Sequence, residues 1–300
     1  MSNVNIGRRR RVLSPLIAGL VVAVAALGLA APALAGKPTG NWANFTQCPL
    51  GNHPSVELCI FAETTSGEFK IGSTAVPLEK RITLQGGTYE ESGKVKFVNA
   101  ANGETLSKTP QTVPGGLLKI MSPEFFPEPL KKIFNEFIDK GITGVTATTE
   151  QVGEIALNFE NEISGKGVAL ILPVRVHLEN SFLGNSCYVG SKAHPITVEL
   201  ITGTTSPPLP NKPITGSLGE LEALESGLLL RLKKNSLVNN TFSAPSAEGC
   251  GSQILFGLFT GLIDGAVGAE VGLPSESGHN TAILNGTQEV GAAEGVRASE

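Results

Sequence analysis

Apolar and polar residues alternate in several short stretches of the chain, which is the pattern of β-strands with one buried face. The clearest stretch covers residues 168–179. The apolar residues that share one face of it are Val168, Leu170, Leu172, Val174, Val176 and Leu178. Pro173 belongs to the opposite face and has no N–H to donate, so we expect the strand to bend there or to lie at a sheet edge. His177 shares that opposite face with Arg175 and Glu179, which indicates a solvated surface and not a metal site.

Further strands are predicted where short apolar runs are separated by turn residues such as Gly, Pro, Asn and Ser. Their ranges are 56–62, 68–71, 82–85, 94–99, 142–148, 154–160, 196–202 and 227–233. Many short strands of this kind are typical of a sandwich or a barrel. We therefore predict a mainly β protein with an antiparallel β-sandwich or barrel-like core, whose strand order the sequence does not reveal.

Two helices are predicted within this β pattern. Apolar residues recur with helical spacing over 130–138, and Gly141 ends the pattern. This amphipathic helix is expected to be an insertion near 127–141 that packs one face on the core. The second helix is predicted near the C-terminus over 252–271, where the residues are apolar on nearly all sides.

The apolar C-terminal helix has two interpretations. Gly257, Gly261 and Gly265 are four residues apart, a spacing that lets another backbone approach closely, as in pairs of membrane helices. Asp264 and Glu270 interrupt the run with charges that are costly in lipid. Burial against the sheet is therefore favoured, and contact with a membrane is the alternative.

The N-terminus has the three parts of a secretory signal peptide. Four arginines at 8–11 precede an apolar run over 16–31, and small residues around a leucine close it at 33–35. We predict that residues 1–35 are a signal peptide removed before Gly36. An uncleaved membrane anchor is the alternative, because the apolar run is almost long enough to span a bilayer.

The mature chain is predicted to be one mainly β domain over 36–287, in one or two lobes, followed by a flexible tail over 288–300. Loss of the four arginines leaves 19 Lys and Arg against 27 Asp and Glu, so its net charge is near −8. A nucleic-acid surface needs clustered positive charge, and anionic lipid attracts basic segments. The acidic balance therefore argues against nucleic acid as a partner and against electrostatic attachment to anionic lipid.

All four cysteines lie in the mature part, and an even number in an exported protein predicts two disulfides. Spacing alone allows three connectivities. We favour Cys48–Cys59, which are close in sequence, and Cys187–Cys250, which both lie in turn-like segments. A catalytic thiol at Cys187 would need a base, for which His194 is the only nearby candidate. A disulfide is therefore preferred at Cys187 over a free thiol or a metal ligand.

The sequence contains no recognisable catalytic or metal-binding pattern. The cysteines lack C-x-x-C spacing. The four histidines are far apart in the sequence, at His53, His177, His194 and His279. The chain has only two aspartates, Asp139 and Asp264, and neither has the context of an EF-hand ligand or of a triad acid. We therefore predict no catalytic residue, no bound metal and no cofactor.

Five segments of the mature chain carry a resemblance to known proteins. They are AETTSGEFKIG, HLENSFLGNSCYVGS, TGTTSPPLPNKPITG, NTFSAPSAEGCG and LPSESGHNTAILNGT. Preceded by Cys48 and Cys59, they resemble a group of secreted actinobacterial proteins that has no assigned activity. The resemblance covers most of the mature chain and implies an extracellular or envelope location. It also supports the pair Cys187–Cys250, because that group places its last two cysteines in the CYVGS and GCG segments.

Export, two disulfides and the lack of chemical motifs predict a non-enzymatic extracellular or cell-surface protein. The alternative is a lipid-binding or envelope-associated protein that uses the apolar segment 252–271. An extracellular hydrolase is less favoured, because no acid–base pair is distinguished in the sequence. Lipid or envelope contact is thus the one partner class that the sequence suggests, and nothing in it points to a small-molecule substrate.

Overall fold

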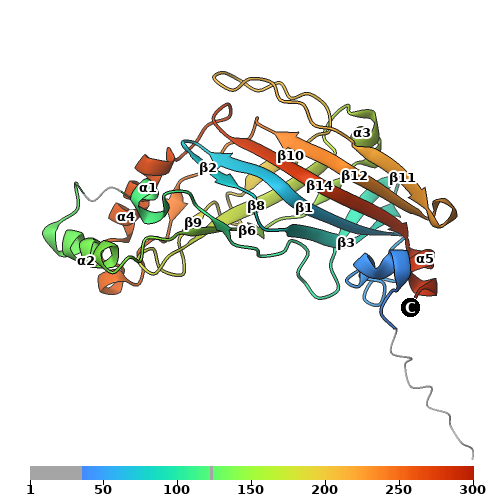
Figure 1. The fold of residues 1–300 in the computed structure, drawn as a ribbon, viewed down its shortest axis with the longest axis horizontal. Helices are drawn as coiled ribbons and strands as arrows, with labels where there is room; N and C mark the ends of the chain where they lie inside the picture. The colour runs from blue at the N-terminus through green and yellow to red at the C-terminus, as the bar shows by residue number, and fades with distance from the viewer. Residues whose placement is uncertain (1–35, 122–123) are drawn as a thin grey trace, which may run out of the picture. The chain divides into compact units, whose positions relative to one another are not determined.

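The computed structural model describes residues 36–121 and 124–300 of the chain (Figure 1), so the predicted signal peptide lies outside the described residues. Gly36–Glu300 forms one compact unit. Within it, the strands form two antiparallel sheets that pack face to face as a β-sandwich, which confirms the predicted fold class. The main hydrophobic core lies between the two sheets.

The first sheet has the strand order β11-β12-β14-β1-β3-β4, and β2 pairs with β1 beside this path. Its strands are β1 (Leu58–Ile71), β2 (Thr74–Pro77), β3 (Ile82–Glu91), β4 (Lys94–Asn99), β11 (Glu220–Leu224), β12 (Leu229–Asn239) and β14 (Thr281–Ala292). The strands predicted at 56–62 and 68–71 are thus parts of one long strand, β1, and the turn residues between them form a register shift at Thr64 and Ser66. Gly286 of β14 lies opposite this shift, where an added Cβ would overlap the carbonyl oxygen of Glu63.

The second sheet is built around β8 (Leu170–Glu179). Its other strands are β5 (Gln111–Thr112), β6 (Thr146–Gln151), β7 (Ala156–Leu157), β9 (Tyr188–Val189), β10 (Ile196–Leu200) and β13 (Ala247–Glu248). The predicted alternation of β8 is confirmed, because its buried side chains are the alternate apolar ones. Pro173 is not at an edge: it faces Thr197 of β10 on one side and lies between the ends of β7 and β6 on the other. No ladder N–H is needed in that gap, which explains why a central strand tolerates proline.

Two isolated β-bridges connect the first sheet with segments that flank strands of the second. Ile201, just after β10, pairs with Val238 of β12. Leu106, in the segment that leads to β5, pairs with Leu84 of β3. These bridges therefore tie β12 and β3 of the first sheet to the chain next to β10 and to the segment before β5.

Helices α1, α2 and α4 lie at one end of the sandwich and α5 lies at the other, whereas α3 lies along its side (Figure 1). They are α1 (Gly116–Ile120), α2 (Glu128–Asp139), α3 (Phe159–Ser164), α4 (Thr260–Val271) and α5 (Ala293–Ala298), with 3₁₀ turns η1 (Gly40–Phe45), η2 (Glu225–Gly227) and η3 (Ile254–Gly257). The amphipathic helix is confirmed as α2, which buries Leu130 and Phe134. The strand predicted at 154–160 is corrected to the short β7 followed by α3, whose N-terminus is capped by the side chain of Asn158.

The apolar segment 252–271 is α-helical only from Thr260 onward, after the 3₁₀ turn η3. Gly257 lies before the helix, so the predicted row of three helical glycines does not form. Gly261 and Gly265 are exposed, and among the described residues no atom lies within 4 Å of a Cβ placed on either one. Their spacing therefore serves no close helix contact within the described chain.

The C-terminal residues differ from the expected flexible tail over 288–300. Residues 288–292 complete β14, and α5 follows directly. Ala293 and Val296 of α5 are buried with Trp42 and Phe45 in a second, smaller hydrophobic cluster. The short apolar pattern at the end of the chain did not indicate this contact, because Trp42 and Phe45 lie near the start of the described chain.

Candidate functional site

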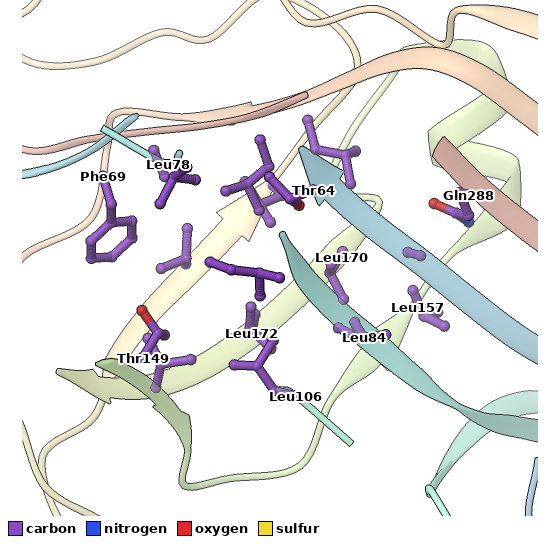
Figure 2. A pocket seen from close by; sticks show the side chains of 18 of the residues that line it. Thr64, Phe69, Leu78, Leu84, Leu106, Thr149, Leu157, Leu170, Leu172 and Gln288 are labelled. Atoms are coloured by element: carbon purple, nitrogen blue, oxygen red, sulfur yellow. The ribbon is translucent and has the colours of Figure 1, made fainter. Parts of the chain in front are cut away.

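An apolar cavity of about 80 Å³ lies between the two sheets. Figure 2 shows side chains of both sheets pointing into it, with Phe69 toward one end and Gln288 toward the other. Leu170 and Leu172 enter from β8, and Leu84 enters from β3 on the opposite sheet. No charged residue lines the cavity in the described chain.

The alternation of two strands places these side chains. On β1, Ile60, Ala62 and Thr64 line the cavity, whereas Cys59 lies on the other face in the smaller hydrophobic cluster. On β8, the alternate residues from Leu170 onward take the same inward role. Because each strand turns one apolar face inward, the cavity is a direct product of the pattern that predicted the strands.

A second cavity of about 40 Å³ continues the apolar interior toward α1 and α4. The two cavities share Phe69, Leu78 and Thr149 in their walls. Ile120 of α1 and Val271 of α4 line the second cavity. The interior is therefore a row of two narrow spaces that runs along the sandwich and ends beneath these helices.

Polar groups are sparse around the two cavities. Gln288 lines the larger cavity, and its Nε2 donates a hydrogen bond of 3.1 Å to Oε2 of Glu162 in α3. Glu162 is only 3 % exposed, and its Oε1 has no hydrogen-bond partner among the described residues. Burial raises the pKa of the Glu162 carboxyl, and the hydrogen bond from Gln288 opposes this rise. The hydroxyl of Thr74, which lines the smaller cavity, likewise lacks a partner in the described chain.

The chemistry of this lining favours an apolar occupant. A water molecule in a buried site needs two to four polar partners, and cavities walled by Leu, Ile and Phe stay dry yet accept apolar molecules. A charged ligand group would lose its hydration here with no opposite charge in the lining to replace it. The cavity can therefore hold hydrocarbon, with polar contacts available at Gln288 and at the hydroxyls of Thr64 and Thr149.

The disulfides lie outside the cavity lining. They pair Cys48 with Cys59 and Cys187 with Cys250, as the sequence favoured. Cys187 is buried and bonded, so it is not a catalytic thiol. Asp264 of α4 accepts hydrogen bonds from the backbone N–H groups of Cys250 (2.7 Å) and Gly249 (3.3 Å). This contact explains the charge within the apolar segment, because Asp264 fastens α4 to the disulfide loop.

Two histidines lie beside aromatic rings at the surface. His53 stacks on Tyr89, and its Nδ1 lies 3.3 Å from the hydroxyl oxygen of Ser55. His177 stacks on Tyr188, and its Nδ1 lies 3.9 Å from a carboxylate oxygen of Glu179. The hydroxyl and the carboxylate thus belong to different histidines, so the three groups of a hydrolytic triad do not meet at either one.

No family model, curated protein or solved structure matches the chain. The resemblance to secreted actinobacterial proteins therefore stays a prediction. Across residues 36–121 and 124–300, no three metal-ligating side chains lie close enough together to hold a metal ion. None of the described helices is long and apolar enough to cross a bilayer.

The sequence could not reveal the cavity or its polar end. Gln288 and Glu162 are 126 residues apart, and Glu162 was one of 25 glutamates with no distinguishing context. The only available signal was the inward face of 168–179, which predicted a buried surface but not a space in front of it.

Proposed function

We propose that the protein is an exported binding protein that encloses a single unbranched hydrocarbon chain in the space between its sheets. The observation that supports this most directly is the uncharged apolar cavity. Two disulfides fit an oxidising extracellular environment, in agreement with export. The separate partners of His53 and His177 favour binding over catalysis.

The shape of the interior favours a linear ligand. Cavities of about 80 and 40 Å³ follow each other and share three wall residues. Their combined volume is less than the roughly 300 Å³ at which typical pockets for drug-sized ligands begin. It is close to the ~150 Å³ of an apolar cavity that admits benzene. A thin chain of a few carbons fits the row, and a longer chain requires the sheets to move apart.

The end of the cavity at Gln288 favours a ligand with an uncharged head group. An anionic head group beside Gln288 would approach the buried carboxyl of Glu162, and no cation in the described lining could balance it. A hydroxyl or an amide can instead exchange a hydrogen bond with the side-chain amide of Gln288. The proposed ligand is therefore an alcohol-like or amide-like amphiphile and not a free fatty-acid anion.

Thermal unfolding with straight-chain primary alcohols from butanol to decanol tests this proposal. Each additional buried methylene contributes about 0.8 kcal/mol, so the dissociation constant should fall about four-fold per carbon until the cavity is full. The rise in Tm at a fixed alcohol concentration should follow the same series. The carboxylate of equal length, measured at pH 8, is the matched control and should stabilise the protein less. A Tm that does not depend on chain length would contradict the proposal.

A further inference from the structure

The loop that leads into α4 lies at the end of the sandwich that carries α1, α2 and α4 (Figure 1). Three of its large apolar side chains are exposed. Phe256 is fully exposed, at 104 % of its reference area, and Leu258 is 76 % exposed. Leu255 beside them is 42 % exposed. We call Leu255, Phe256 and Leu258 the apolar tip. Isolated exposed apolar residues are normal at protein surfaces, but three within four positions on one loop form a patch that calls for an explanation.

The apolar tip is held in place by the structure behind it. The disulfide at Cys250 and the hydrogen bond from the N–H of Gly251 to the carbonyl oxygen of Leu183 anchor the start of the loop. The hydroxyl of Thr260 donates to the carbonyl oxygen of Gly257 at 2.9 Å and joins the loop to α4. The loop therefore presents its apolar side chains from a fixed base.

The stretch of sequence that contains the apolar tip has no charged residue. Residues 250–263 include no Lys, Arg, Asp or Glu, and the first charge after them, Asp264, binds the disulfide loop. Gly261 and Gly265 extend the uncharged surface along the exposed side of α4. The loop itself therefore offers a partner apolar contact and no ion pair.

We propose that the apolar tip inserts into the surface of a lipid bilayer. A second copy of the chain is a poorer partner, because a stable dimer buries about 800 Å² on each subunit, more than one phenylalanine and two partly exposed leucines can supply. A projecting loop without charge has the form of an interfacial anchor, whose binding depends on the apolar area that it buries in the membrane. Three exposed side chains bury only a small apolar area in the membrane, so the attachment of the protein should be reversible.

The position of α4 connects the apolar tip with the interior of the protein. The N-terminus of α4 follows the tip, and Val271 near its C-terminus lines the smaller cavity. Ile120 of α1, which packs against α4, lines the same cavity. Docking of the tip would thus bring the helical end of the apolar interior to the membrane, where hydrocarbon ligands are found. The docking surface itself does not depend on what the cavity binds.

Flotation of the purified protein with phosphatidylcholine vesicles tests the insertion. The wild-type protein should float with the vesicles, equally well at low and high salt, because no charge contributes. The variant Phe256→Ser/Leu258→Ser should bind at least tenfold more weakly, since each side chain loses apolar burial in the membrane. The matched control is Leu209→Ser/Leu221→Ser, which removes two exposed leucines from a loop and from β11 and should float like the wild-type protein.

Failure of this inference can be told apart from failure of the proposed function. The tip variant should keep its Tm and its response to decanol, because both substituted side chains are exposed. A wild-type protein that stays in solution, or a tip variant that floats as well as the wild-type protein, would overturn the insertion and leave the cavity proposal intact. Flotation that needs anionic lipid and is lost in salt would also overturn it, as would a dimer in solution that the tip variant abolishes.

Discussion

Filling the cavity between the sheets should stabilise the protein and abolish ligand binding at the same time. Ala62 of β1 lines the cavity, and its pairing partners across the sheet are Gln288 and Leu84. The side chain is only partly buried although it lies on the inner face, so the space in front of it is available. The substitution Ala62→Leu adds three carbon atoms to this space.

The volume of the cavity sets the size of the effect. An empty cavity costs about 24 cal/mol per Å³, so 80 Å³ corresponds to about 2 kcal/mol. Burial of three methyl or methylene groups, at about 0.8 kcal/mol each, gives a similar upper limit. For a chain of this size, Ala62→Leu should therefore raise Tm by about 4 to 8 °C without ligand.

Two measurements on the same samples check this prediction. Thermal unfolding without ligand should show the rise in Tm, and addition of octanol should raise the Tm of the wild-type protein but not that of Ala62→Leu. The control is Ala223→Leu on an exposed position of β11, which should change the free energy of unfolding by no more than about 0.5 kcal/mol and leave octanol binding intact. A lower Tm for Ala62→Leu together with unchanged octanol binding would refute the reasoning, because it would mean that the space is already packed.

Three further predictions concern the scaffold. Replacing the second disulfide by Cys187→Ala/Cys250→Ala should lower the free energy of unfolding by about 4 kcal/mol in the loop-closure description, measured by urea titration; a loss below about 1 kcal/mol would contradict it. Because burial raises the pKa of Glu162 in the folded chain, the stability from its protonated form is complete below the unfolded pKa and is lost as pH rises through the folded pKa. The Tm of Glu162→Gln relative to wild type should therefore increase from pH 4 to pH 8, and a constant difference would show that the carboxyl does not titrate differently on folding. Gly286→Val should prevent correct pairing of β1 with β14, because its Cβ would overlap the carbonyl oxygen of Glu63, and circular dichroism should show loss of cooperative unfolding; a normal transition would exclude that close approach.

The sequence predicted those parts of the fold that depend on local periodicity. The alternation around Leu172 defined β8 and its inward face, and the helical spacing around Phe134 defined α2. Both patterns arise from residues that bury a single face of one element, so neighbouring positions contain the information. The disulfides could also be predicted, because four cysteines have few ways to pair.

Features that depend on contacts between residues far apart in the sequence could not be predicted. β1 was divided in two because Ser66 and Gly67 resemble a turn, whereas pairing with β14 carries the strand through a register shift there. The segment 252–271 is apolar all round, so periodicity could not show that its first part forms a loop around Phe256. The C-terminal α5 is fixed by burial against Trp42, a contact between the two ends of the described chain.

Of the candidate site, the sequence predicted only the apolar residues of its walls. The inward apolar face of β8 was foreseen, but a cavity depends on how two sheets fail to fill the space between them. The pair formed by Gln288 and Glu162 joins β14 to α3, and nothing in either local sequence indicates it. The site therefore depends on packing between elements, which a single sequence does not show.

Contact between an alcohol chain and the cavity wall is the most direct test of the account. Intermolecular nuclear Overhauser effects can be recorded between octanol and methyl-labelled leucines of the purified protein. We expect signals from octanol to Leu84 and Leu172, which line the cavity from opposite sheets, and none to the exposed Leu209. Signals confined to exposed leucines, or no signal at a saturating octanol concentration, would contradict the claim that the space between the sheets is a binding site.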